Sequence, residues 1–394
     1  MRRRPPRSTQ SRSSAASDVY KRQIKDRPDG EVTDPLVGPI TDAPQGVGLS
    51  RPPRLARHRI HLDDGHPVGI TMAGSGIPLV VIHGFTAEGF LYAQTLSRLC
   101  GMGFRVIAID IAGHGGTAGL PEDGANIAAY SALVKRVLDE LGIRHALLAG
   151  HSMGGRLVTQ LAANHPERVL GVVLIDAIVG DTWDRMVYLF RVWPPLLGAV
   201  GVALMVDSIL VPPLSRDPRQ AVKFLRLFTP TLLGHVAKPW RLLGPAVSIL
   251  RTRSSRYALD AAAAEGVPFY ILHGDRDVAV PHRTSEDAAR RVGADLITVE
   301  KAGHSWLLSD PETLPAIMAE LLEGRLGDDL RAAFVELGVG EDPDLPAIHS
   351  ACYEPGAAVF DLALPEPQEY TDTAVKRAGP AFAWHRHVPD VTAA

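Results

Sequence analysis

The serine in the stretch Gly150-His151-Ser152-Met153-Gly154-Gly155 has the setting of a catalytic nucleophile. An apolar strand at residues 146–149 precedes it, and a helix is predicted at residues 153–165. A sharp turn from strand to helix lifts Ser152 out of the sheet and needs glycine on both sides, because the backbones approach too closely for a Cβ. The turn also aims the free N–H groups of the helix N-terminus at an oxyanion beside Ser152. The stretch therefore predicts nucleophilic catalysis by Ser152.

Two groups that could activate this serine follow later in the chain. The apolar strand 268–272 leads into His273-Gly274-Asp275-Arg276-Asp277, and the strand 295–300 leads into a loop that carries His304. A histidine in this position takes the serine proton and later delivers it to the leaving group. A carboxylate beside it holds the imidazole in the correct tautomer. The sequence thus predicts a triad of serine, aspartate and histidine, in that order along the chain.

Two further motifs complete a pattern that resembles the serine α/β-hydrolases of the esterase, lipase and C–C hydrolase superfamily. They are His83-Gly84-Phe85 and the run Asp110-Ile111-Ala112-Gly113-His114-Gly115-Gly116-Thr117. The resemblance covers residues 58–324. It implies an α/β-hydrolase fold that carries its active groups at the carboxyl ends of the strands.

The resemblance also implies the role of each site residue. Ser152 is the nucleophile, His304 the base and Asp277 the acid of the triad. The oxyanion hole is expected to use the backbone N–H groups of Phe85 and Met153.

Several residues near this site have alternative interpretations. Asp275 and Asp176, which ends the sixth predicted strand, are the other candidates for the triad acid. Asp110 is expected to fix its glycine-rich loop, because Asp accepts hydrogen bonds from nearby backbone N–H groups. The remaining histidines at this rim of the sheet are expected to be structural; they are His83, His114 and His151.

No metal site, cofactor or nucleic-acid partner is expected. His58, His61 and His66 have a ligand-like spacing, but they lie in alternating segments typical of an exposed hairpin. No phosphate-binding loop or dinucleotide fingerprint is visible, and a net charge of −3 gives no support to nucleic-acid binding. The two cysteines, Cys100 and Cys352, do not imply a disulfide framework, so a cytoplasmic location is expected.

The order of apolar segments predicts a mostly parallel, eight-stranded sheet with helices on both faces. The expected strands are residues 57–62, 67–72, 78–83, 105–110, 146–150, 170–176, 268–273 and 295–300. We expect the hydrolase core to consist of two parts, residues 56–180 and 266–324.

The segment 181–265, between the sixth and seventh strands, is much longer than a simple crossover connection requires. The resemblance implies that this segment forms a helical cap. The run from Val192 to Val206 carries no charge. It is shorter than the roughly 20 residues of a membrane span, so we expect it to line an apolar acyl pocket and to allow weak contact with lipid. The basic residues later in the segment are expected to be solvated; they are Arg241, Arg251, Arg253 and Arg256.

Both ends of the chain lie outside the resemblance. Residues 1–23 resemble translated sequencing-adapter read-through, and residues 1–55 as a whole are expected to be disordered. Residues 325–394 form an extension with one predicted helix at 328–337 and an irregular tail from Gly338 onward, to which the sequence assigns no function.

These features predict a cofactor-independent serine hydrolase that cleaves a small ester with a hydrophobic acyl or alcohol part. Two other enzymatic reactions use a similar site: C–C bond hydrolysis and cofactor-free, haloperoxidase-like perhydrolysis. A receptor-like relative that binds a ligand and turns over little is the alternative from a different class. An epoxide hydrolase or dehalogenase is disfavoured, because those relatives carry Asp where this chain has Ser152.

Overall fold

The computed structural model describes residues 55–85, 87–120, 125–201, 229, 233–234, 237–364 and 379–389. The segment predicted to be disordered, including its adapter-like first 23 residues, lies outside the described residues except for Leu55. Among the described helices, none combines the length and the apolar character that a membrane crossing requires.

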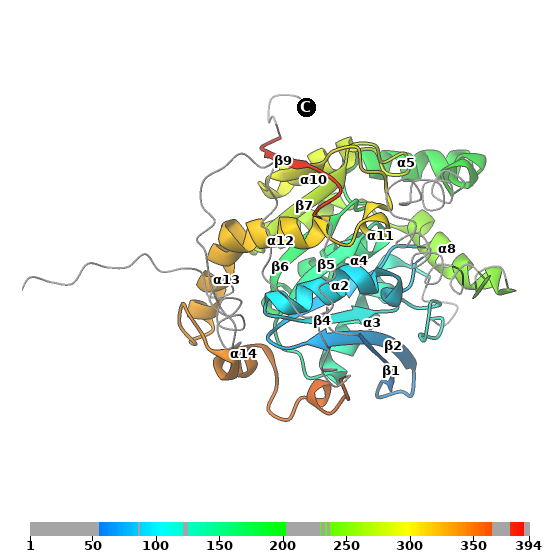
Figure 1. Cartoon of the computed structure of the whole chain (residues 1–394). Helices are drawn as coiled ribbons and strands as arrows, with labels where there is room; N and C mark the ends of the chain where they lie inside the picture. The colour runs from blue at the N-terminus through cyan, green and yellow to red at the C-terminus, as the bar shows by residue number, and fades with distance from the viewer. Residues whose placement is uncertain are drawn as a thin grey trace, which may run out of the picture.

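The described strands form one sheet in the order β1-β2-β4-β3-β5-β6-β7-β8-β9 (Figure 1). Strands β4, β3, β5, β6, β7 and β8 pair in parallel, whereas β1 with β2, β2 with β4, and β8 with β9 pair antiparallel. The strands are β1 (Ala56–His61), β2 (Pro67–Gly74), β3 (Ile77–Ile82), β4 (Phe104–Ile109), β5 (Ala146–His151), β6 (Val169–Ile175), β7 (Phe269–Gly274), β8 (Leu296–Val299) and β9 (Trp384–His387). The predicted α/β-hydrolase fold is confirmed.

Helices cover both faces of this sheet, which explains why the central strands are apolar throughout. Strands β3, β4, β5 and β7 are buried at every residue. One face carries α2 (Ala93–Leu99) and α12 (Thr313–Glu323), which contact each other. The other face carries α3 (Ile127–Glu140), α4 (Met153–Asn164), α9 (Arg256–Ala264) and α10 (Arg283–Val292), packed in that order.

The segment between β6 and β7 is helical in its described parts. It contains α5 (Asp181–Val192), the 3-10 segment η6 (Pro239–Leu242), α8 (Leu243–Arg251) and α9. Helix α9 packs against α4 and α10, so the end of the predicted cap range contacts the core directly. Part of the uncharged run, residues 202–206, lies outside the described residues.

The C-terminal extension differs from the prediction of eight strands and an irregular tail. It forms α13 (Arg325–Glu336), α14 (Leu345–Cys352) and a ninth strand, β9, which pairs with β8. Helix α14 begins where the Asp344 carboxylate accepts a hydrogen bond from Ala347 N at 2.9 Å. Strand β9 is held by backbone pairing, which its sequence Trp-His-Arg-His does not reveal.

The remaining short elements connect these layers. They are α11 (Trp306–Ser309) and the 3-10 segments η1 (Gly89–Tyr92), η2 (Cys100–Met102), η4 (Pro166–Arg168) and η7 (Ala358–Phe360).

Candidate active site

Ser152 occupies a strained turn between β5 and α4. Its φ of 53° and ψ of −118° are rarely adopted by a residue with a side chain. A Cβ at Gly150 would lie 2.5 Å from the backbone of Gly154, and one at Gly154 would overlap the Ile82 carbonyl oxygen. The two glycines therefore let the strand and the helix approach closely enough to hold Ser152 at the carboxyl end of the sheet.

The loop after β3 lies directly against this serine. A Cβ at Gly84 would lie 3.2 Å from Ser152 Cβ, which brings the next residue, Phe85, close to Ser152. Within the described part of the chain, neither Phe85 N–H nor Met153 N–H donates a hydrogen bond. These two N–H groups are the ones that the sequence nominated for an oxyanion hole.

His304 and Asp277 form a buried hydrogen-bonded pair. His304 Nδ1 lies 2.6 Å from Asp277 Oδ2, while Asp277 Oδ1 accepts hydrogen bonds from Ala279 N and Val280 N at 2.8 Å. Burial acts to raise the pKa of Asp277, but the His304 ring and these hydrogen bonds outweigh it and hold the pKa below its ordinary value. Asp277 is therefore a carboxylate that can orient His304, whereas Asp275 is exposed.

His151 links the histidine loop to the nucleophile turn. Its ring lies 4.8 Å from the His304 ring between centroids, and its Nε2–H donates to the His304 carbonyl oxygen at 2.9 Å. Its Nδ1 accepts from the Tyr92 hydroxyl at 2.9 Å. Burial lowers the pKa of His151 to about 3, so the ring stays neutral and has a structural role. Because His151 directly precedes Ser152, these contacts hold the His304 loop beside the serine.

A second buried carboxyl group, Asp176, joins the two loops that carry Asp277 and His304. Its Oδ1 accepts from Gly274 N at 2.8 Å and its Oδ2 from Trp306 Nε1 at 2.6 Å. Asp176 has a φ of 45°, and burial together with the nearby Asp277 charge raises its pKa well above the ordinary value. Asp176 therefore fixes the end of β7 and the residues after His304. Trp306 was not among the predicted site residues, because no local sequence pattern indicates its bond to Asp176.

His273 holds the loop that carries Asp277. Its Nε2–H donates to the Val280 carbonyl oxygen at 2.9 Å, and its Nδ1 lies 2.7 Å from Ser285 Oγ. Burial lowers its pKa to about 4. Among the described residues, Asp176, His273 and Asp277 are grouped closely enough to ligate a metal ion, and His58, His61 and His66 are not. Because hydrogen bonds within the protein already engage the ligand atoms of the first three, the group fits a supporting network better than a metal centre.

The structural roles expected for the other rim residues agree with their contacts. His83 Nε2 accepts from Ile111 N at 3.0 Å, and His114 Nε2 lies 2.6 Å from the Phe85 carbonyl oxygen. Asp110 accepts from Gly89 N and Gly116 N at 2.9 and 3.0 Å, which fixes the glycine-rich loop as predicted. His114 thereby also holds the loop that carries Phe85 N–H.

Comparison with known proteins agrees with this fold. The family model described as "Alpha/beta hydrolase family" matches residues 79–316, more than half of the chain. The chain belongs to the alpha/beta hydrolase family.

Relatives of this α/β-hydrolase include enzymes with different reactions. It is 34% identical over 272 residues to a protein of Mycobacterium phage D29 provisionally named a non-heme haloperoxidase, covering 67% of this chain and 94% of the relative. It is 28% identical to the pimeloyl-[acyl-carrier protein] methyl ester esterase of Neisseria meningitidis serogroup B, covering 62% of this chain and 93% of that enzyme. A solved structure of a bacterial membrane phospholipase A superposes with a TM-score of 0.56 at 22% identity, covering 70% and 87% of the two chains, and shows the fold alone.

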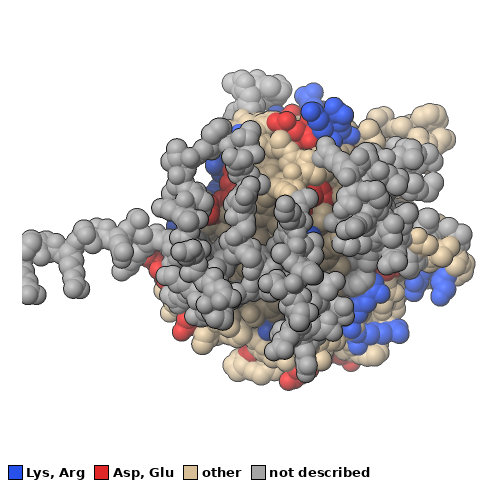
Figure 2. All heavy atoms as spheres, viewed as in Figure 1, with Lys and Arg blue, Asp and Glu red and all other residues tan. Residues whose placement is uncertain are grey.

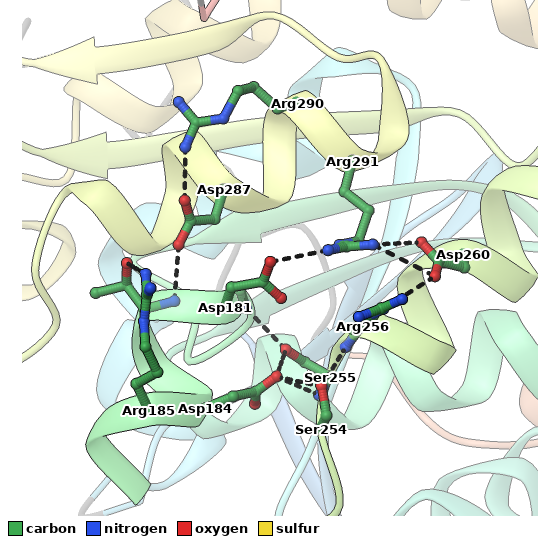
Figure 3. A network of polar contacts seen from close by, with 12 residues as sticks. Asp181, Asp184, Arg185, Ser254, Ser255, Arg256, Asp260, Asp287, Arg290 and Arg291 are labelled. Atoms are coloured by element: carbon green, nitrogen blue, oxygen red, sulfur yellow. Dashed lines mark hydrogen bonds and ion pairs between the residues drawn. The ribbon is translucent and has the colours of Figure 1, made fainter. Parts of the chain in front are cut away.

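A polar network ties both ends of the segment between β6 and β7 to the core (Figure 3). Arg291 on α10 binds Asp181 at 2.8 Å and Asp260 at 3.0 Å, so one guanidinium joins the start of α5 to α9. Asp184 Oδ2 accepts from Ser254 Oγ at 2.7 Å and from Ser255 N at 2.8 Å. These bonds fix the two points at which the segment leaves and rejoins the α/β-hydrolase core.

Proposed function

We propose that this α/β-hydrolase is a cofactor-independent serine hydrolase that cleaves a carboxylic ester with a hydrophobic acyl or alcohol part. Ser152 Oγ attacks the acyl carbon while His304 Nε2 takes its proton, and the Phe85 and Met153 N–H groups stabilise the oxyanion. His304 then protonates the leaving alcohol, which leaves an acyl group on Ser152. Water, deprotonated by His304, attacks this acyl-enzyme, and expulsion of Ser152 Oγ releases the acid.

The observation that carries the proposal is the combination of the Ser152 turn with the Asp277–His304 pair. The strained φ of 53° at Ser152 costs energy that folding must offset, and such strain is concentrated at functional sites. The 2.6 Å contact between Asp277 Oδ2 and His304 Nδ1 gives Nδ1 the proton, so Nε2 carries the lone pair that acts as a base.

Hydrolysis of p-nitrophenyl esters from acetyl to palmitoyl, with purified full chain and its Ser152→Ala variant, tests the proposal. We expect turnover and fluorophosphonate labelling that both depend on Ser152, with folding of the variant unchanged by circular dichroism. Retained turnover in Ser152→Ala would refute the mechanism. Labelling of Ser152 without turnover of any ester would refute the ester substrate and favour a C–C hydrolase or a receptor-like relative.

A second candidate reaction is perhydrolysis, in which hydrogen peroxide replaces water in the attack on the acyl-enzyme. The observation that favours it is the 34% identity to the phage protein provisionally named a haloperoxidase. Bromination of monochlorodimedone in acetate buffer with peroxide and bromide measures this reaction, because the peracetic acid that is formed oxidises bromide to the brominating species. We expect it to be slower than hydrolysis of the preferred ester, and a faster, Ser152-dependent rate would reverse the order of the two proposals.

A further inference from the structure

Among the described residues, the segment between β6 and β7 carries most of the exposed large hydrophobic side chains. Eight of the thirteen exposed large hydrophobic side chains in the described residues lie within residues 181–265. Single exposed hydrophobic residues are normal, but a concentration in one region marks an interaction surface. The eight side chains are Tyr188, Leu189, Val192, Trp193, Leu233, Trp240, Leu243 and Tyr257.

Helix α5 shows this most clearly, because large apolar side chains lie on its exposed side as well as on its buried side, the exposed ones beside Arg185 and Arg191. Trp183, Val187 and Phe190 are buried against the core. Tyr188, Leu189, Val192 and Trp193 project to solvent with exposed fractions of 50–65%. A helix that needed only to cover the core would carry polar residues on its second side. The outer side of α5 therefore has the composition of a surface that meets another apolar phase.

The same segment is basic. Residues 181–265 contain eleven Lys or Arg and six Asp or Glu, a formal net charge of +5 in a chain whose total is −3. The remaining residues together are therefore acidic, and the positive charge is concentrated in this region. Near the outer end of α8, Figure 2 shows blue Lys or Arg side chains beside tan surface, which carries no Asp or Glu. Positive charge beside exposed Trp and Tyr matches the interface of an anionic bilayer.

Helices α5 and α8 present this surface together. They contact each other, and Arg191 Nη2 on α5 donates to the Thr252 carbonyl oxygen, just after α8, at 2.6 Å. Figure 1 places both helices on the same side of the sheet core. Exposed Trp193 lies just beyond α5, and exposed Trp240 lies in η6, just before α8. Because the polar network of Asp184 and Arg291 fixes the segment to the core, the surface is held in place.

We propose that the outer surface of α5, η6 and α8 docks this enzyme on an anionic lipid bilayer, with Tyr188, Trp193 and Trp240 inserted among the headgroups. Lys238 directly precedes η6 and Arg251 ends α8, and both bind lipid phosphates through their positive charge. The proposal is independent of the reaction proposed above, since it concerns where the protein sits.

Flotation with vesicles tests this docking. The full chain carrying Ser152→Ala, which removes any hydrolysis of lipid, is mixed with vesicles of phosphatidylcholine alone or with about 30% phosphatidylglycerol. We expect binding to the anionic vesicles and much weaker binding to the neutral ones. In this background the pair Lys238→Gln and Arg251→Gln should weaken binding roughly 30-fold, at about 1 kcal/mol per basic residue. Trp193→Ser should weaken it roughly tenfold through lost apolar contact.

Matched substitutions outside the surface provide the controls. Arg59→Gln on β1 removes an exposed positive charge, and Val335→Ser on α13 removes an exposed apolar side chain. Both should bind vesicles like the parent. Three results would overturn the proposal: no vesicle binding, equal losses in the controls, or a concentration-dependent dimer that Trp193→Ser abolishes. Saturable binding of a monomeric anionic amphiphile without vesicle binding would also overturn it and assign the charge to a substrate site.

Discussion

Replacing Asp277 by Asn probes the hydrogen-bond pattern of the candidate triad most directly. Asp277 Oδ1 accepts from two backbone N–H groups, those of Ala279 and Val280. The amide oxygen of the new side chain must take this place, because an NH₂ group there would face two donors. The NH₂ group then faces His304 Nδ1 and forces that atom to become an acceptor. The ring proton moves to His304 Nε2, which can no longer accept the Ser152 proton.

The size of the effect follows from this change of tautomer. Where an orienting Asp is changed to Asn, kcat falls about 10⁴-fold, which corresponds to about 5 kcal/mol of transition-state stabilisation. KM should change little, since Asp277 is buried behind His304 and does not face the substrate. Asp275→Asn is the matched control two residues away, and because Asp275 is exposed we expect kcat within about threefold of the parent.

The assay is steady-state hydrolysis of the best p-nitrophenyl ester, with circular dichroism to verify folding of both variants. A loss in Asp275→Asn as large as in Asp277→Asn would contradict the assignment. A normal kcat in Asp277→Asn would show that the 2.6 Å contact has no part in catalysis and would return attention to Asp176.

Three further predictions concern stability and the support of the site. First, the buried rings of His151 and His273 have pKa values of about 3 and 4, against 6.5 when unfolded, so only the unfolded state takes up protons as the pH falls below 6.5. The free energy of unfolding should then drop by about 3 kcal/mol between pH 6.5 and about pH 5 in urea titrations, and a flat profile would exclude this linkage. Second, Gly150→Ala should prevent formation of the turn and give insoluble or inactive protein, whereas Gly119→Ala, whose Cβ meets nothing within 4 Å, should behave like the parent in thermal unfolding. Third, Trp306→Phe leaves Asp176 Oδ2 without its hydrogen-bond donor, so the free energy of unfolding should fall by about 1–3 kcal/mol and kcat should also fall. Trp384→Phe loses only an exposed hydrogen bond to Glu320 and should change neither quantity.

The parts of the fold that the sequence predicted are those in which apolar runs are long and glycines mark the turns. The strands from β1 to β8 begin and end within two residues of the expected positions, because each is an apolar or alternating run bounded by polar or glycine residues. Strand β9 was missed because four residues of which three are polar carry no period-two pattern, and their pairing depends on the edge of β8.

The candidate site also has a part that the sequence predicted and a part that it did not. Ser152, Asp277 and His304 were nominated from local motifs, and the structure brings Asp277 and His304 into contact. The tie between Asp176 and Trp306 joins residues 130 positions apart, and no local pattern encodes such a bond. Its stability depends on both loops being folded already, so it can be recognised only from the tertiary structure.

The C-terminal strand determines which strand forms this edge of the sheet. Strand β8 would otherwise be the last strand of a parallel sheet, with a row of unpaired N–H and C=O groups open to another chain. Strand β9 occupies that edge, and the exposed His385 and Arg386 on it present polar groups outward. A protein shortened to residues 79–316, which the family model matches, would thus lose the strand that pairs with β8. It would present a bare β-edge, and we expect aggregation through that edge before any loss of the catalytic geometry.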